Sequence, residues 1–400
     1  MEKTKKDHLV LSKLSYTAWI LLVYMLGRRI VLYGIDQSQY LLTDANAEAF
    51  LGMALGGDIR KISVFALGIS PYMLASILVM VVTTIRRAVS RSKMSIRRTN
   101  QVLWIICYLF AVYQAMAMVT QLHFDPAAGP AMVVEVTAGL QMIAGAMMIL
   151  WLSEQNKQFG IGGQSVLILV NILESIIVMV SGCSPEELML PAACALAAML
   201  ITLNMEHAEF RMPVQRISIH NIYADKNYIA VKLNPVGVLP AVFATAVFNL
   251  LQMALVFARY LLRDVTDLQW LVDKLSFMEP VGVGIYIGII YLLTVVFSMI
   301  LVSPGEMAEQ LLKSNDSLCN IPSGKKTKRY LTRVVLILSL ISATVMSICV
   351  AGPLVWQFYG DVAAGLMMLP SVVMMLTGVC VNVYREFETV ISFDSYWVFL

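Results

Sequence analysis

The sequence predicts an all-α polytopic membrane protein with ten transmembrane helices arranged as two inverted halves. Hydrophobic residues make up 59% of the 400 residues and charged residues only 14%, and the mean hydropathy is +0.75. Soluble domains are about 45–50% apolar and about 25% charged. Because no polar stretch is long enough to enclose a core of its own, we expect one membrane domain over residues 1–400.

A helix needs about 20 apolar residues to cross the hydrocarbon core of a bilayer. The first apolar run contains Arg28 and Arg29 and has no small-residue cleavage signature, so it predicts a retained span rather than a signal peptide. The ten predicted spans are 14–33, 62–84, 102–120, 132–152, 165–183, 188–205, 236–258, 281–303, 331–352 and 362–383.

The charges of the connecting segments predict the orientation. "IRRAVSRSKMSIRR", between spans two and three, holds six Arg or Lys residues, and the segment 311–333 between spans eight and nine also holds six. The segment 34–58, on the other side, carries four acidic residues and no basic one. Basic loops stay in the cytoplasm, so we expect a multi-pass protein of the cell membrane with both termini cytoplasmic.

An internal echo opens spans two and seven. Residues 67–76 read "LGISPYMLAS" and residues 236–245 read "VGVLPAVFAT", with Gly, Pro, Ala and a hydroxyl residue at the same offsets. An odd number of spans separates the two segments, so the halves 1–185 (spans 1–5) and 186–400 (spans 6–10) have opposite topology. Paired Gly/Pro-interrupted helices in inverted halves predict a site at the interface between the halves.

Four stretches, in order along the chain, resemble the SecY protein-conducting channel family. They are "GGDIRKISVFALGISPYMLAS" (56–76), "WLSEQNKQFGIGG" (151–163), "KLNPVGVLPAVFAT" (232–245) and "SPGEMAEQLLKS" (303–314). The similarity extends from about Gly27 to about Cys380. It implies a SecY-like fold with a central pore, in a subunit that passes secretory polypeptides across the cytoplasmic membrane.

The resemblance implies a ring of apolar side chains at the waist of the pore. Its members by alignment are Ile69, Met73, Leu169 and Val242, with Met368 as the fifth. Such a ring deforms around a passing chain and forms a dewetted constriction when empty. Residues 45–57 would be the plug below the ring, with Gly56 and Gly57 as its hinge.

Spans two and seven would form the lateral gate through which a signal sequence leaves for lipid. Small residues at this seam allow close approach and separation of helices. The predicted gate residues are Gly68, Pro71, Ala75, Ser76, Gly237, Pro240, Ala244 and Thr245.

The cytoplasmic loops 206–232 and 304–333 would bind the ribosome or a translocation motor. The alternative is that their basic residues only fix the orientation of the chain. The predicted contacts are Arg211, Arg216, Lys325, Lys326, Lys328 and Arg329.

Departures from the family pattern indicate a specialised member. Pro322 stands where the family carries an Arg that matters for motor coupling, and Gly163 and Gln164 replace an Asn-Gly pair. These changes resemble the accessory SecY of some Gram-positive bacteria. The resemblance implies an accessory SecA-type ATPase, a precursor with a signal sequence from the serine-rich glycosylated adhesins, and small SecE- or SecG-like or accessory Sec subunits as partners.

No pattern in the sequence predicts an enzyme. "PSGKKT" (322–327) does not satisfy a phosphate-loop motif, the four histidines are dispersed, and the six cysteines lack metal or redox spacing. We therefore expect no cofactor, no metal site and no direct contact with nucleic acid, and energy supplied by a partner.

A secondary transporter is the competing class, because it also uses inverted halves and broken helices. Glu174, with Asn171 one turn away, would then be the proton or ion site, since an intramembrane acid is functional by default. Within a channel Glu174 has no assigned role. Arg28 and Arg29 are expected to reach the outer interface or to face the protein interior.

Overall fold

The computed structural model describes most of the chain, and every structural statement below concerns that part. The described residues are 2–35, 62–90, 95–122, 124–181, 184–216, 228–261, 270–271, 274–277, 279–318, 321–356 and 366–396. The predicted plug, 45–57, with Gly56 and Gly57, lies outside them.

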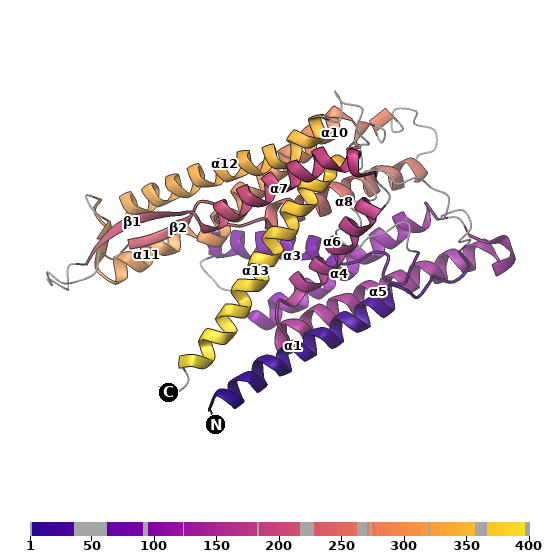
Figure 1. Cartoon of the computed structure of the whole chain (residues 1–400), viewed down its shortest axis with the longest axis horizontal. Coiled ribbons are helices and arrows are strands. Elements are labelled where there is room, and N and C mark those ends of the chain that lie inside the picture. The colour runs from indigo at the N-terminus through magenta and orange to yellow at the C-terminus, as the bar shows by residue number, and fades with distance from the viewer. Residues whose placement is uncertain are drawn as a thin grey trace.

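Ten long helices form one elongated bundle (Figure 1). In the described part of the chain, nine helices are long and apolar enough to cross a membrane, and the apolar helix segment Ser70–Arg86 is somewhat shorter. The ten are α1 (Glu2–Gly27), α3 (Ser70–Ser90), α4 (Ile96–Val119), α5 (Ala131–Phe159), α6 (Gly163–Ser181), α7 (Pro185–His207), α8 (Leu239–Leu261), α10 (Pro280–Val302), α12 (Lys325–Trp356) and α13 (Leu369–Tyr396). The predicted all-α membrane fold is confirmed.

Two predicted spans were wrong at one end. The first was predicted to reach residue 33, but α1 ends at Gly27, whose Cα lies against the ring of Phe65. The second was predicted to begin at residue 62, but α3 begins at Ser70. The apolar residues between these points pair with each other instead of forming helix: Val64 donates its N–H to the Ile30 carbonyl oxygen at 2.9 Å.

The last two spans extend beyond their predicted limits. α12 begins at Lys325 rather than 331 and ends at Trp356 rather than 352. The tenth was predicted at 362–383, but α13 covers Leu369–Tyr396 after a short 3₁₀ helix, η3 (Leu366–Met368). Hydropathy locates only the apolar part of a helix. The backbone hydrogen bonds of both helices continue beyond that part, into segments that contain charged residues.

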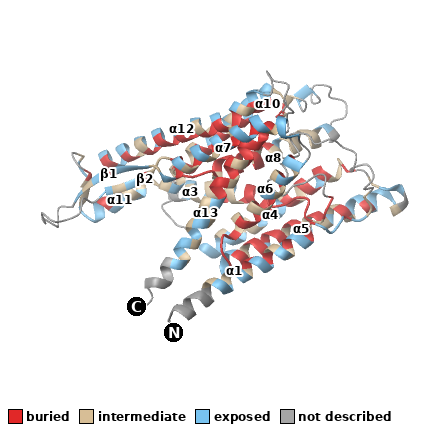
Figure 2. Cartoon of the chain, viewed as in Figure 1, coloured by how far each residue is buried: buried red, intermediate tan, exposed pale blue. Residues whose placement is uncertain are grey.

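Helices of each half pack mainly on neighbours from the same half, and two seams join the halves. α3 and α4 contact α8 at one seam, and α13 lies along α6 at the other. Buried residues gather where α7, α8 and α13 meet and along the inner faces of α4 and α5 (Figure 2). One apolar cluster extends across both halves, from Ile69 and Leu167 to Phe248 and Met375.

A small sheet projects from one end of the bundle, the end toward which both termini also point (Figure 1). Its strands are β1 (Glu209–Arg216), β2 (Tyr228–Lys232) and β3 (Asp316–Leu318), in the antiparallel order β2-β1-β3. The strands come from the two loops predicted at 206–232 and 304–333. The amphipathic helix α11 (Pro304–Lys313) packs beside them on α12.

Candidate functional site

The two echo segments adopt the same backbone turn. Gly68 has φ +56° and Gly237 has φ +73°, a region that residues with a Cβ rarely enter. Each glycine lies two residues before a helix, α3 or α8. Pro71 and Pro240 then occupy the second helical position, where a missing N–H costs no intrahelical hydrogen bond.

Hydrogen bonds repeat at the same offsets in both segments. Met73 donates its N–H to the Ile69 oxygen at 3.1 Å, and Val242 donates to the Val238 oxygen at 3.3 Å. The hydroxyl groups repeat as well. Ser76 donates to the Met73 oxygen and Thr245 to the Val242 oxygen, both at 2.7 Å. The two segments are therefore one local structure used twice.

Four of the predicted gate residues are small: Ala75 and Ser76 lie on α3, and Ala244 and Thr245 lie on α8, which contacts α3. Ala75 and Ala244 are fully buried, Thr245 is buried, and Ser76 is partly exposed. Small residues let two helix backbones approach closely and leave few interlocked side chains to separate. The predicted gate residues thus fall on two helices that contact each other.

The five predicted ring residues lie in or against the central apolar cluster. Ile69, Met73, Val242 and Met368 are each at most 1% exposed. Leu169, on α6, is partly buried and packs against the same cluster. These residues come from α3 and the turn before it, α6, α8 and η3, and all belong to or pack against one apolar cluster that extends across both halves.

Arg28 lies just past the end of α1 and is 8% exposed. Its guanidinium donates to the Asn171 side-chain oxygen at 2.8 Å and forms an ion pair with Glu174 at 2.5 Å, both on α6. Tyr24 donates to the same Asn171 oxygen at 2.8 Å. Arg28 thus faces the protein interior, which was one of the two positions expected from the sequence. Glu174 is a partner of this arginine, whereas Arg29 is exposed.

The turn between α5 and α6 is built around Asn156. Its amide donates to the backbone oxygens of Ile161 and Gly163, and its oxygen accepts from Thr17 on α1. Gly162 has φ +79° and donates its N–H to Glu386 of α13 at 3.0 Å. The stretch "GIGG" therefore forms a tight helix connection that also contacts the other half of the chain.

The predicted basic contacts lie around the projecting sheet. Arg211 stacks over the Tyr228 ring at 4.7 Å and lies 3.5 Å from Glu209. Arg216 is the last residue of β1, opposite Asp316 of β3. The remaining predicted contacts are exposed on the first turns of α12: Lys325, Lys326, Lys328 and Arg329.

The sheet has its own apolar base. Met212, Val231, Leu311, Leu318 and Leu331 are buried there together, from β1, β2, α11, β3 and α12. The loops 206–232 and 304–333 thus contribute strands to one sheet with a shared apolar base. Alternating apolar residues at 210, 212 and 214 were the signal in the sequence that a strand begins here.

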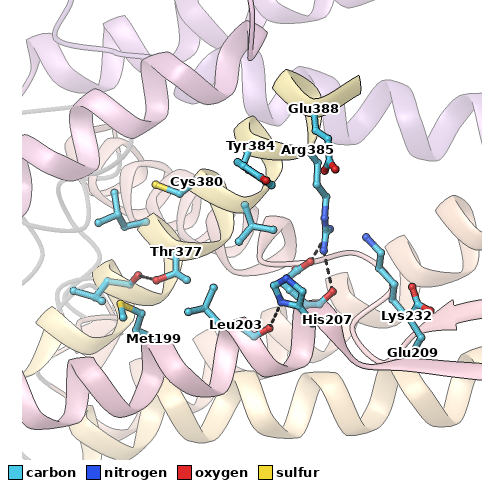
Figure 3. Close-up of a pocket in the computed structure, with 14 residues that line it drawn as sticks. Met199, Leu203, His207, Glu209, Lys232, Thr377, Cys380, Tyr384, Arg385 and Glu388 are labelled. Carbon is cyan, nitrogen blue, oxygen red and sulfur yellow. Dashed lines mark hydrogen bonds and ion pairs between the residues drawn. The ribbon is translucent and has the colours of Figure 1, made fainter. Parts of the chain in front are cut away.

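A cavity of about 780 Å³ lies between α7, α13 and the base of the sheet (Figure 3). One wall is apolar, and charged side chains stand at the other. Glu206 is 2% exposed and accepts a hydrogen bond from Arg385 at 2.8 Å. Burial lowers the pKa of Lys232, Arg385 lowers it further, and Glu206 and Glu209 act in the opposite direction.

Sequence reasoning missed Glu206, Arg385 and Glu386 as structural contacts. The available signal was that opposite charges follow spans six and ten, which end on the same side of the membrane. Among the described residues, no group of three His, Cys, Asp or Glu side chains is placed to hold a metal ion.

Comparisons with known proteins agree with this arrangement. A family model described as SecY matches residues 63–384. A protein of Leuconostoc gelidum subsp. gasicomitatum, described as "Accessory Sec system protein translocase subunit SecY2", is 27% identical and aligns over 99% of this chain and 98% of its own. A Streptococcus salivarius protein of the same description is 26% identical, with 97% of each chain covered. A solved structure described as that of a protein-conducting channel has a TM-score of 0.65 at 16% identity, covering 95% of this chain and 92% of its own.

Proposed function

Because the chain belongs to the SecY family, we propose that it is the central channel subunit of an accessory Sec translocase that exports serine-rich glycosylated adhesins. SecY-family proteins are protein-conducting channels and not enzymes. The observation that carries the proposal is the apolar waist, at which two helices begin from similar glycine turns, Gly68 with φ +56° and Gly237 with φ +73°.

The waist seals the resting membrane around an adaptable ring. Ile69, Met73, Leu169, Val242 and Met368 present only apolar atoms, so a narrow passage between them stays dry and resists ions. Met73 and Met368 are unbranched and rotate readily, which lets the ring fit polypeptides of different shape. Residues 45–57, outside the described part of the chain, would act as the plug.

A signal sequence leaves this channel between α3 and α8. The seam carries alanines and hydroxyl residues whose hydrogen bonds go to their own helix, as Ser76 and Thr245 do. Separation of the two helices therefore breaks no side-chain hydrogen bond that these two residues make. Gly68 and Gly237 absorb the backbone rotation, since glycine tolerates both signs of φ.

The sheet, α11 and the first turns of α12 form the docking platform for an accessory SecA-type ATPase in the cytoplasm. Lys325, Lys326, Lys328 and Arg329 give it an exposed positive surface, and charge of one sign steers an acidic partner toward it. The protein lies in the cell membrane, and both termini are on the cytoplasmic side, as the platform is. The chain assembles with small SecE- or SecG-like or accessory Sec subunits.

The decisive experiment is a site-specific crosslink from the ring. A photoreactive residue is placed at Met73, and a secretory precursor is stalled in membranes that contain the accessory ATPase. The matched control is Ile105 on α4, which is 62% exposed on the outer surface of the bundle. We expect capture of the mature part of the precursor at Met73 and none at Ile105. Equal capture at both positions, or none at Met73, refutes the channel assignment.

The transporter alternative lacks a comparable observation. Its candidate ion site, Glu174, is already neutralised by Arg28.

A further inference from the structure

Glu206 lies at the end of the transmembrane part of α7 and accepts two hydrogen bonds from one arginine. Arg385 of α13 donates one hydrogen bond to the Glu206 carboxylate and one to its backbone oxygen, both at 2.8 Å. The side chain of Glu206 is 2% exposed, whereas that of Arg385 is 32% exposed. The end of α7 is therefore fixed to α13.

The second carboxylate oxygen of Glu206 faces the hinge of α8. A Cβ built on Gly237 would lie 2.7 Å from Glu206 Oε1, closer than ordinary packing permits. This oxygen is buried and has no hydrogen-bond partner among the described residues. Two constraints therefore favour glycine at position 237. Its φ of +73° and the nearby carboxylate of Glu206 each disfavour a side chain there.

The same short segment is the base of the docking platform. β1 begins three residues after Glu206, and β2 ends at Lys232, five residues before Gly237. Leu233 donates its N–H to the Ala208 oxygen at 2.8 Å, and Ser342 of α12 donates to the Asn234 side chain at 2.8 Å. The connection between sheet and hinge is thus held along its length.

We propose that Glu206, held by Arg385, is a positioning residue that seats the Gly237 hinge and couples the docking platform to the gate between α3 and α8. The proposal rests on the function proposed above. A buried charged oxygen without a partner is costly, so the seated hinge is not the most favourable state for this carboxylate. Displacement of the hinge lets Oε1 be hydrated. Arg385 keeps Glu206 in place, but the unpartnered Oε1 makes displacement of the Gly237 hinge less costly. A motor that moves the sheet can therefore displace this hinge.

The distance between the gate helices tests the coupling. Spin labels are attached at Leu78 of α3 and Leu251 of α8, both exposed, in a cysteine-free chain reconstituted in vesicles. Glu206→Gln and Arg385→Gln should each shift the inter-label distance by about 2 Å or more, the scale of helix shifts in switching proteins. The double variant should shift it no further, since both changes remove the same contact.

Glu386→Gln is the matched control. It removes one carboxylate from the residue that follows Arg385 on α13. Glu386 accepts a hydrogen bond from the Gly162 N–H in the other half and makes none with Gly237. It should leave the distance unchanged. Gly237→Ala keeps the Glu206–Arg385 pair and crowds the seat, and it should shift the distance even if Glu206 variants fold poorly.

A purely structural role for the pair would lower the unfolding temperature but leave the distance unchanged in folded protein, and that result overturns the proposal. An equal shift in Glu386→Gln overturns it as well. The two proposals fail separately. Capture of precursor at Met73 with unchanged distances refutes the coupling alone, whereas absent capture refutes the channel.

Discussion

Arg28 shows how a charged residue is accommodated inside the bundle. Its guanidinium is shared between the Asn171 oxygen and Glu174, so the charge placed at the end of α1 is neutralised from α6. An unpaired arginine at the centre of a bilayer costs about 2.5–3.5 kcal/mol on insertion scales. The pair therefore holds α1 against α6 and offsets that cost.

Loss of the cation should harm the protein more than loss of both charges. Arg28→Ala removes the cation that faces Glu174, and breaking a buried pair costs about 3–5 kcal/mol, less here because Glu174 is 33% exposed. Arg28→Ala with Glu174→Gln should recover part of the lost thermal stability, measured by unfolding in detergent. Glu174→Gln alone should retain translocation. A double variant no more stable than Arg28→Ala, or loss of transport in Glu174→Gln, would contradict this account.

At this scale the sequence was informative about local conformation and not about partners. The turns at Gly68 and Gly237 were predictable, because a glycine three residues before a proline, repeated in both halves, favours a particular local backbone conformation. Asn171 was noticed as a neighbour of Glu174, but its contact with Arg28 joins residues 143 positions apart. A single sequence contains no signal that selects one distant acceptor among many.

Among the elements, the docking platform depends on two loops that complete each other. β1 comes from one loop and β3 from the other, and Leu331 of α12 is fully buried beneath them. The basic charges predicted that both loops are cytoplasmic but could not predict that they share a sheet, because antiparallel pairing across a long separation is set by tertiary packing. The helix ends were missed for a related reason, since the segment 62–69 is mostly apolar, yet Ile62 and Val64 pair with the chain after α1.

The basic residues on α12 should contribute to ATPase binding and not to stability. Changing Lys325, Lys326, Lys328 and Arg329 to Gln removes four exposed charges, each worth up to about 1 kcal/mol in an exposed pair. We expect affinity for the ATPase to fall about tenfold or more at low salt, with a weaker salt dependence and an unchanged unfolding temperature.

Arg97 and Arg98 provide the control, because they are equally exposed at the start of α4. Their change to Gln alters the net charge on the predicted cytoplasmic side without touching the platform. If both sets weaken binding by the same factor, the effect comes from general surface charge and the platform assignment fails.

For the whole molecule, the arrangement of the halves explains why a repeat was detectable at all. The two opening segments adopt one backbone turn, and there the echo is seen in Gly68 and Gly237. Elsewhere the halves diverge: one half carries the Arg28–Glu174 pair and the other carries the Glu206–Arg385 pair. The symmetric parts were predictable from the sequence, and the two ion pairs were not.

The seal is a property of the assembled waist, and widening it from both halves should open the resting membrane to ions. Ile69→Gly removes a side chain next to α3 and Val242→Gly removes one from α8, both from the central cluster. A dewetted constriction conducts once it is wide enough to hold water. We expect the double variant in a planar bilayer to conduct in the absence of precursor, each single variant to conduct less, and Ile105→Gly, which removes an exposed side chain from α4, to remain tight. Deletion of residues 45–57 should raise the conductance of the double variant further. A double variant as tight as the parent chain would place the barrier away from this cluster, and the ring would then have to be sought at another depth along α3 and α8.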